Sequence, residues 1–274
     1  MLKSALAAVA ALTLTLSAAD AHATNYSLWI HGRTSGTPTG WSYWSNGHGQ
    51  QIETGVNAVP VNYDGSAHIS QSNPSVVASL NQYCTGGNSC YIQCHSAGCS
   101  QIGYAEALYP GHWNIIWVLT GGSAAGGSEL AGNLAYFFTG KAMDQDLAVG
   151  TMRGLYNHDV LGDDIAGYVY NYVGGDYASL TTCLFPGGCL FGSGGNDSAV
   201  AFHSAGHFRS SGTHGSVGSN GSAGGTYWDY SWALWVDSTN GSAGHCIDGS
   251  YPCEEGYAGG VMGVVSGTAA AYDK

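Results

Sequence analysis

The stretch from Cys90 to Tyr109 limits the possible folds of this chain more than any other. Its first part, 91–94, is a short β-prone run, and its last part, 100–109, combines good helix formers with apolar residues at helical spacing. Ser96 lies between them in the sequence Cys-His-Ser-Ala-Gly. A strand that turns sharply into a helix with serine at the turn is the context of a nucleophile elbow. The stretch therefore predicts Ser96 as a nucleophile.

The elbow consensus is Gly-x-Ser-x-Gly, and Cys94 occupies the place of its first glycine. Strand and helix approach closely at this position, so it needs a small residue, and cysteine meets that need. The N–H of Ala97, the residue after the serine, is expected to point toward the substrate oxygen. The alternative interpretation is that Ser96 is an ordinary turn serine.

The first residues have the pattern of a signal peptide, which we predict over residues 1–23. Lys3 precedes an apolar run from Ala5 to Ala19, and Ala21-His22-Ala23 fits a cleavage site. This run is too short to span a bilayer, and no later segment is apolar for long enough. We therefore expect a secreted or periplasmic protein with no membrane span, whose residues 24–274 form a single domain.

The composition restricts the partners of the protein. Lys and Arg total 6 against 18 Asp and Glu, and the formal net charge of −12 argues against nucleic acid or an anionic membrane surface. Only 9% of the residues are charged, whereas the chain contains 44 Gly, 18 Tyr and 8 Trp. Exposed aromatic side chains would suit an apolar or sugar substrate, although most of them are expected in the core.

Eight cysteines in an exported chain imply disulfide bonds. They form four pairs that are close in sequence, and local pairing is the simplest connectivity. The pairs are Cys84 with Cys90, Cys94 with Cys99, Cys183 with Cys189, and Cys246 with Cys253. A bond between Cys94 and Cys99 would staple the elbow. A Cys94 thiolate nucleophile is the rival interpretation, which an even cysteine count outside the cytosol disfavours.

Apolar runs alternate with helical patterns along the chain, which predicts right-handed βαβ units and a parallel sheet. Besides the elbow strand, we expect strands over 26–30, 56–63, 113–119, 168–173 and 227–236. Asn73 and Pro74 are expected to open a helix as its N-cap and first residue. The buried stripe of that helix would consist of Val76, Val77, Leu80 and Tyr83. Further helical stretches are expected within 134–161 and 254–271.

The predicted strand 26–30 runs into His31-Gly32-Arg33, ahead of a loop that contains glycine. A strand that ends in His-Gly before such a loop commonly supplies the second donor of an oxyanion hole. The donor would be the next N–H, that of Arg33. A plain turn is the alternative, but the place of this segment shortly before the elbow favours the oxyanion loop.

Four places in the sequence together resemble the α/β-hydrolases and, among them, the secreted bacterial lipases and esterases. They are Ile30-His31-Gly32, the elbow around Ser96, Gly126-Gly127-Ser128-Glu129, and Asn196-Asp197-Ser198-Ala199-Val200. The resemblance implies an α/β-hydrolase fold, with a mostly parallel central sheet flanked by helices and Gly-rich, disulfide-stapled loops. Lipases of this kind carry the triad acid in an Asn-Asp-Gly-x-Val segment. Cys94 and Ser198 depart from the family pattern and leave the subfamily open.

A serine hydroxyl needs a histidine to accept its proton and a carboxylate to orient that histidine. In this fold the chain order is serine, acid, histidine. The resemblance favours Asp197 as the acid, and Asp176, directly after the predicted strand 168–173, is the alternative. His245 follows the last predicted strand and is the preferred base, with His214 as the alternative.

These residues predict hydrolysis of carboxylic esters through an acyl-enzyme. Ser96, His245 and Asp197 would form the triad, and the N–H groups of Arg33 and Ala97 would form the oxyanion hole. We expect a small-molecule or polymeric ester, including polyester, as the substrate and no cofactor. The sequence leaves the oligomeric state open.

Two other classes of function remain as alternatives. His203, His207 and His214 resemble a zinc-ligand cluster, but the His-Glu-x-x-His pattern of zinc proteases is absent from the sequence. A non-catalytic binding protein on a hydrolase scaffold is the second alternative, because fold does not fix function. Asp248, close to His245, leaves a structural calcium site open.

Overall fold

The computed structural model describes residues 23–41, 55–131, 139–155, 168–173, 199–200, 204, 232–236 and 245. Residues 1–22 of the predicted signal peptide and the predicted helix over 254–271 lie outside these ranges. Within the described ranges, no helix has the length and apolar character that a membrane crossing requires.

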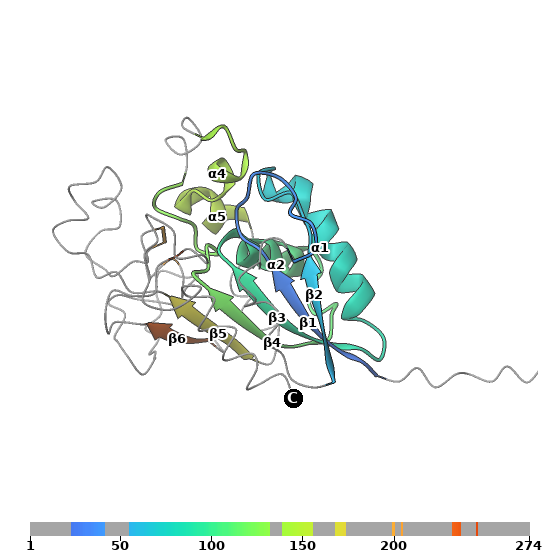
Figure 1. The fold of residues 1–274 in the computed structure, drawn as a ribbon. Helices are drawn as coiled ribbons and strands as arrows, with labels where there is room; N and C mark the ends of the chain where they lie inside the picture. Colours follow the sequence, from blue (N-terminus) through green and yellow to red (C-terminus); the bar gives the residue numbers. More distant parts are fainter. Residues whose placement is uncertain are drawn as a thin grey trace, which may run out of the picture.

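A parallel sheet of six strands forms the centre of the described structure (Figure 1). The strands are β1 (Asn25–Ile30), β2 (Val56–Val61), β3 (Ser89–His95), β4 (Ile115–Gly121), β5 (Tyr168–Val173) and β6 (Trp232–Val236). Their order in the sheet is β2-β1-β3-β4-β5-β6, and every neighbouring pair is parallel. Parallel strands place all their carboxyl ends at one edge, which is where open α/β sheets bind ligands.

The order of the strands brings the two predicted site loops together. β3 lies between β1 and β4, and Ile30 at the end of β1 pairs with Cys94 near the end of β3. The loop after β1 and the turn after β3 therefore begin side by side. Apolar residues of β1 and β3, such as Leu28 and Ile92, are fully buried, as expected for central parallel strands.

Four helices accompany the sheet in the described ranges: α1 (Ile69–Tyr83), α2 (Ala97–Leu108), α4 (Met143–Asp146) and α5 (Val149–Leu155). α1 and α2 lie side by side, and buried polar groups join them (Figure 1). Nδ2 of Asn73 donates to the backbone oxygen of Gln101 at 2.7 Å and to its Oε1 at 2.9 Å. In α1, Val76 and Leu80 are buried, whereas Val77 and Tyr83 are half-buried.

The predicted start of α1 at Asn73 and Pro74 is wrong. The helix begins at Ile69, with His68 as its N-cap, and Pro74 lies inside it. The cause is a distant side chain: Asp146 Oδ2 accepts the Ile69 N–H at 2.7 Å, and Asp146 Oδ1 lies 3.0 Å from Nδ1 of His68. A carboxylate at a helix N-terminus supplies a missing acceptor and favours the helix dipole. This cap allows α1 to begin before the proline.

Two of the predicted disulfide bonds are present. Cys84 pairs with Cys90 at a Cα–Cα distance of 5.3 Å, and Cys94 pairs with Cys99 at 5.0 Å. The second bond joins the end of β3 to the first turn of α2, on either side of Ser96. Because Cys94 is oxidised, it is not a thiolate nucleophile. Cys183, Cys189, Cys246 and Cys253 lie outside the described residues.

Candidate active site

Ser96 occupies the turn between β3 and α2 in a conformation that side chains other than glycine rarely adopt. Its backbone angles are φ 52° and ψ −123°, and it is the one residue besides glycine with positive φ in the described ranges. Such strain persists only where neighbours determine the conformation. Here the Ser96 N–H donates to Gly121 O at 3.0 Å, and its carbonyl accepts the Ala124 N–H at 3.1 Å. The turn after β3 is thus held by the end of β4.

Gly98 explains why the elbow motif ends in glycine. A Cβ at this position would lie 2.4 Å from the carbonyl oxygen of His31 and 2.6 Å from that of Ile30. The N-terminus of α2 therefore packs directly on the end of β1. The opposite side of the motif tolerates Cys94, whose side chain forms the bond to Cys99.

The imidazole of His245 lies against the Ser96 hydroxyl. Its Nε2 is 2.8 Å from Ser96 Oγ, although the two residues are 149 positions apart in sequence. This distance allows a neutral imidazole to accept the hydroxyl proton. Ser96 is 6% exposed and His245 is half-buried, so the pair is largely shielded from water.

His95, immediately before the serine, contacts the backbone of His245. The His95 Nε2 lies 2.6 Å from the His245 carbonyl oxygen, and the two rings are 4.9 Å apart between centroids. Burial, and next the charge of His245, lower the pKa of His95 from 6.5 to about 3, so the ring is neutral at pH 7. Since a carbonyl only accepts, the neutral ring carries its proton on Nε2. This contact thereby joins the backbone of His245 to the residue that precedes Ser96.

The His31 ring anchors the loop that follows β1. Its Nδ1 lies 2.7 Å from Gly32 O and its Nε2 lies 3.0 Å from Tyr63 O. The Tyr63 ring stacks on it at 4.0 Å, and the Tyr63 hydroxyl donates to His31 O at 2.6 Å. Burial lowers the pKa of His31 to about 4, partly opposed by its backbone hydrogen bonds. The loop is therefore fixed by a neutral, stacked ring.

The two predicted oxyanion donors lie on adjoining segments. Ala97 begins α2, and Arg33 lies in the loop after β1 whose start packs on Gly98. Within the described residues, neither the Arg33 nor the Ala97 N–H donates to a protein acceptor. Both groups are thus available to a ligand oxygen as far as these residues are concerned.

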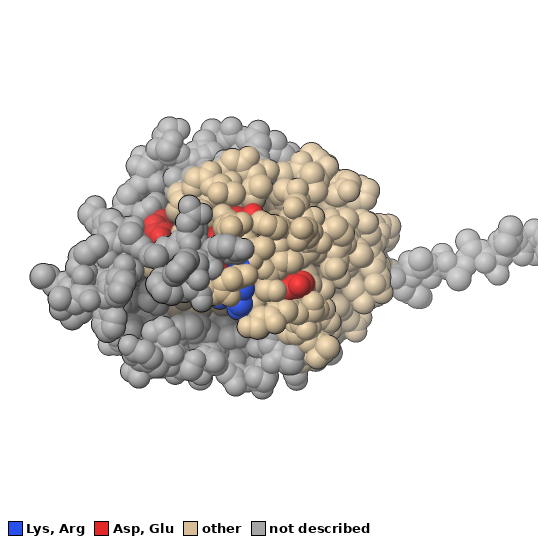
Figure 2. All heavy atoms as spheres, turned by 90° about the horizontal axis from the view of Figure 1, so that it is seen from above, with Lys and Arg blue, Asp and Glu red and all other residues tan. Residues whose placement is uncertain are grey.

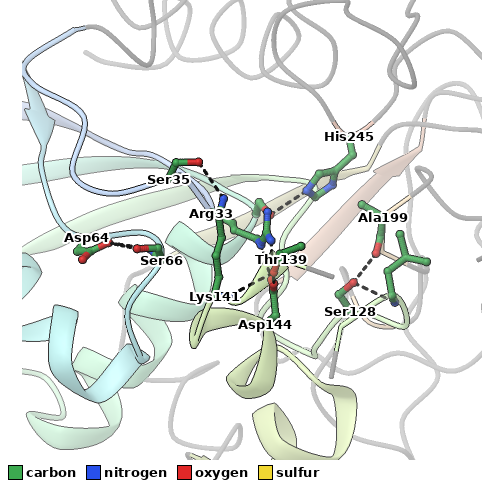
Figure 3. A network of polar contacts seen from close by, with 12 residues as sticks. Arg33, Ser35, Asp64, Ser66, Ser128, Thr139, Lys141, Asp144, Ala199 and His245 are labelled. Atoms are coloured by element: carbon green, nitrogen blue, oxygen red, sulfur yellow. Dashed lines mark hydrogen bonds and ion pairs between the residues drawn. The ribbon is translucent and has the colours of Figure 1, made fainter. Parts of the chain in front are cut away.

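The segment Gly126–Glu129, which is part of the resemblance, contacts Ala199 and Ser204 in the structure. Ser128 Oγ donates to Ala199 O at 2.6 Å (Figure 3), and the Gly126 N–H donates to Ser204 O at 3.1 Å. Ser204 Oγ also donates to the Glu129 carboxylate. The loop after β4 therefore holds Ala199 and Ser204.

Several predicted site residues lie outside the described residues. These are Asp197, Asp176, His203, His207, His214 and Asp248. The choice of triad acid and the zinc hypothesis thus stay predictions. Among the residues that the structure does describe, no three His, Cys, Asp or Glu side chains gather as metal ligands would.

Sequence reasoning missed three residues that support the site: His95, Tyr63 and Asp144. Asp144 binds the Arg33 side chain across 111 positions of sequence (Figure 3). The position of His95 inside the elbow motif, directly before Ser96, is the sequence signal that could have identified it. For Tyr63 and Asp144, the sequence contains no local pattern that indicates their partners.

The fold is that of the α/β-hydrolases. The propeptide form of the Bacillus licheniformis lipase BlEst2 superposes with a TM-score of 0.50 and 22% identity, over 66% of this chain and 43% of that one. The mature form of BlEst2 superposes with a TM-score of 0.48 and 20% identity, over 79% of this chain and 85% of that one. The Staphylococcus hyicus lipase superposes with a TM-score of 0.49 and 10% identity, over 78% of this chain and 86% of that one.

The chain thus spans less than half the length of the BlEst2 propeptide form. No protein-family model matches the sequence, and no curated protein matches it. The likeness to the BlEst2 propeptide form, at 22% identity, shows the fold alone.

Replacing Gly98 by alanine should destabilise the protein and displace the loop after β1. The new Cβ would meet two backbone oxygens, which cannot rotate away, so we expect a loss of about 3 kcal/mol in the free energy of unfolding. Gly150→Ala in α5 is the matched control. A Cβ there meets nothing within 4 Å, and alanine should add about 0.5 to 1 kcal/mol. Urea unfolding of both variants checks this; equal stabilities would contradict the close approach.

The protein should lose stability as the pH falls below about 6.5, because His95 and His31 stay neutral when folded. The unfolded chain takes up protons on both rings below that pH, which favours unfolding until the folded pKa values of about 3 and 4 are reached. Each ring contributes about 1.4 kcal/mol per pH unit within this window. Urea unfolding at pH 7 and pH 5 measures the slope. His95→Gln should have a clearly smaller slope, and an unchanged slope would refute the assignment.

Proposed function

We propose that the protein is a serine hydrolase that cleaves carboxylic esters through an acyl-enzyme. The observation that carries this proposal is the 2.8 Å contact between His245 Nε2 and Ser96 Oγ, made at a serine with the strained backbone of a nucleophile elbow. An ordinary turn serine needs neither the strain nor an imidazole within hydrogen-bond distance of its hydroxyl. The α/β-hydrolase fold agrees with this chemistry.

The catalytic cycle follows from the positions of these groups. His245 accepts the Ser96 proton on Nε2 while Oγ attacks the ester carbonyl carbon. The N–H groups of Arg33 and Ala97 stabilise the resulting oxyanion. His245 then protonates the leaving alcohol, and the acyl-enzyme forms. Water, deprotonated by the same imidazole, releases the acid and restores Ser96.

Asp197 is our candidate for the acid that orients His245, with Asp176 as the alternative. The support for Asp197 is indirect: Ala199, two residues later in the sequence, is bound by Ser128 in the loop after β4. That same loop holds the Ser96 carbonyl through Ala124. A carboxylate just before Ala199 would therefore lie in a segment that the loop beside the elbow holds.

An uncharged ester suits the described surface best. Figure 2 shows the side of the molecule on which α4 lies, and most of its described atoms belong to residues without charge. Such a surface favours an acyl chain or a polyester over a charged substrate. The disulfide bonds support action in a secreted or periplasmic setting.

Steady-state hydrolysis of p-nitrophenyl acetate, butyrate and a long-chain ester tests the proposal. Ser96→Ala should lower kcat/KM by about 10⁴-fold or more, because the nucleophile is lost. Ser79→Ala, at a half-buried serine of α1 whose hydroxyl donates to the Ser75 carbonyl, is the control and should match the wild type. Full activity of a folded Ser96→Ala variant would exclude the serine mechanism, and loss of activity with chelator would favour zinc.

The same assay decides between the two acids. Asp197→Asn should lower kcat by about 10⁴-fold, as loss of the orienting carboxylate does in other triads. Asp176→Asn should then remain close to wild type. The reverse pattern would transfer the role to Asp176.

A further inference from the structure

The Arg33 side chain binds the Asp144 carboxylate through both arms of its guanidinium (Figure 3). Nε donates to Oδ1, and Nη2 donates to Oδ2 at 2.8 Å. The Arg33 side chain is 30% exposed and that of Asp144 only 3%. A bidentate, mostly buried pair of this kind fixes geometry, which an exposed ion pair does not.

The segment that carries Asp144 is itself anchored. Thr139 Oγ1 donates to Asp144 Oδ2, and the Met143 N–H donates to Ser66 O at 3.1 Å. A second contact reaches the loop after β1, where Lys141 Nζ donates to Ser35 Oγ at 3.1 Å (Figure 3). The fully buried Met143 side chain secures α4 in the core. Asp144 is therefore a fixed support for Arg33.

The Gly32 carbonyl, which belongs to the same peptide group as the Arg33 N–H, is held by other residues. The Gly32 carbonyl lies 2.7 Å from His31 Nδ1 and accepts from the Tyr63 hydroxyl at 3.3 Å. In a planar trans peptide, the Gly32 C=O and the Arg33 N–H point in opposite directions. Fixing the carbonyl from one side and the Arg33 side chain from the other therefore fixes the direction of the N–H.

We propose that Asp144 is a positioning residue for the oxyanion hole: by binding the guanidinium of Arg33, it keeps the Arg33 N–H directed at the substrate oxygen. This inference rests on the proposed function, because it assigns a support to one of the two donors. It also explains why the cation of Arg33 is neutralised. The guanidinium fixes the orientation of the Arg33 backbone and does not itself bind the oxyanion.

The two roles of Arg33 predict opposite results for Asp144→Asn. If the guanidinium itself stabilised the oxyanion, removing its counter-charge would leave kcat equal or higher. If Asp144 positions the N–H, the variant loses one well-placed donor. We then expect kcat to fall about 10- to 100-fold, while KM changes less than about 2-fold.

Asp146→Asn is the matched control, since Asp146 lies on the same helix but caps α1 instead of binding Arg33. It should lose stability and keep the wild-type kcat. The affinity for phenylboronic acid, whose adduct on Ser96 places an oxygen in the oxyanion hole, gives a second readout. Its inhibition constant should rise in Asp144→Asn by the same factor by which kcat falls, and remain unchanged in Asp146→Asn.

Every outcome of this comparison decides the inference. An active wild type whose Asp144→Asn variant keeps kcat and boronate affinity overturns the positioning role and leaves the proposed function intact. A wild type without esterase activity overturns the proposed function and the inference with it. If Asp144→Asn does not fold, Arg33→Lys replaces it, because lysine keeps the charge and the N–H but lacks the bidentate fork. The same fall in kcat is then expected.

Discussion

The close approach of α2 to the end of β1 is the constraint on which the rest of the site depends. Gly98 leaves no room for a side chain against the carbonyl groups of Ile30 and His31. This contact brings the helix N-terminus, with Ala97 and Ser96, next to the loop that carries Arg33. The Cys94–Cys99 bond, the Gly121 carbonyl that accepts the Ser96 N–H, and the Ala124 N–H that donates to the Ser96 carbonyl then hold the strained serine in place.

Neutral buried histidines connect these parts without placing an unpaired charge in the core. His31 stacks on Tyr63 and holds the loop after β1, while His95 donates to the backbone of His245. Burial disfavours the charged form of both rings, so each stays neutral at pH 7 and acts only through its hydrogen bonds and packing. In the proposed mechanism, His245 is the ring that exchanges a proton with Ser96. The ion pair of Arg33 with Asp144 completes the arrangement from the side of α4.

The fold and the strand, turn and helix around Ser96 could be predicted from the sequence because their signals are local. The strand before Ser96, the helix after it and the short Cys84–Cys90 and Cys94–Cys99 separations are each visible within a few residues. The start of α1 and the anchor of Arg33 could not be predicted, since Asp146 and Asp144 act across 77 and 111 positions. A cap or ion pair between two distant segments leaves no periodic pattern in the sequence of either segment.

A fluorophosphonate, which reacts only with activated serines, shows most directly whether Ser96 is the nucleophile. The folded protein would be labelled and the modified residue located by peptide mass spectrometry. We expect one phosphonyl group per molecule on Ser96, and labelling at least about 100-fold slower in His245→Ala, because the base is lost. Label on a different serine, or an unlabelled Ser96 in a folded protein, would contradict it.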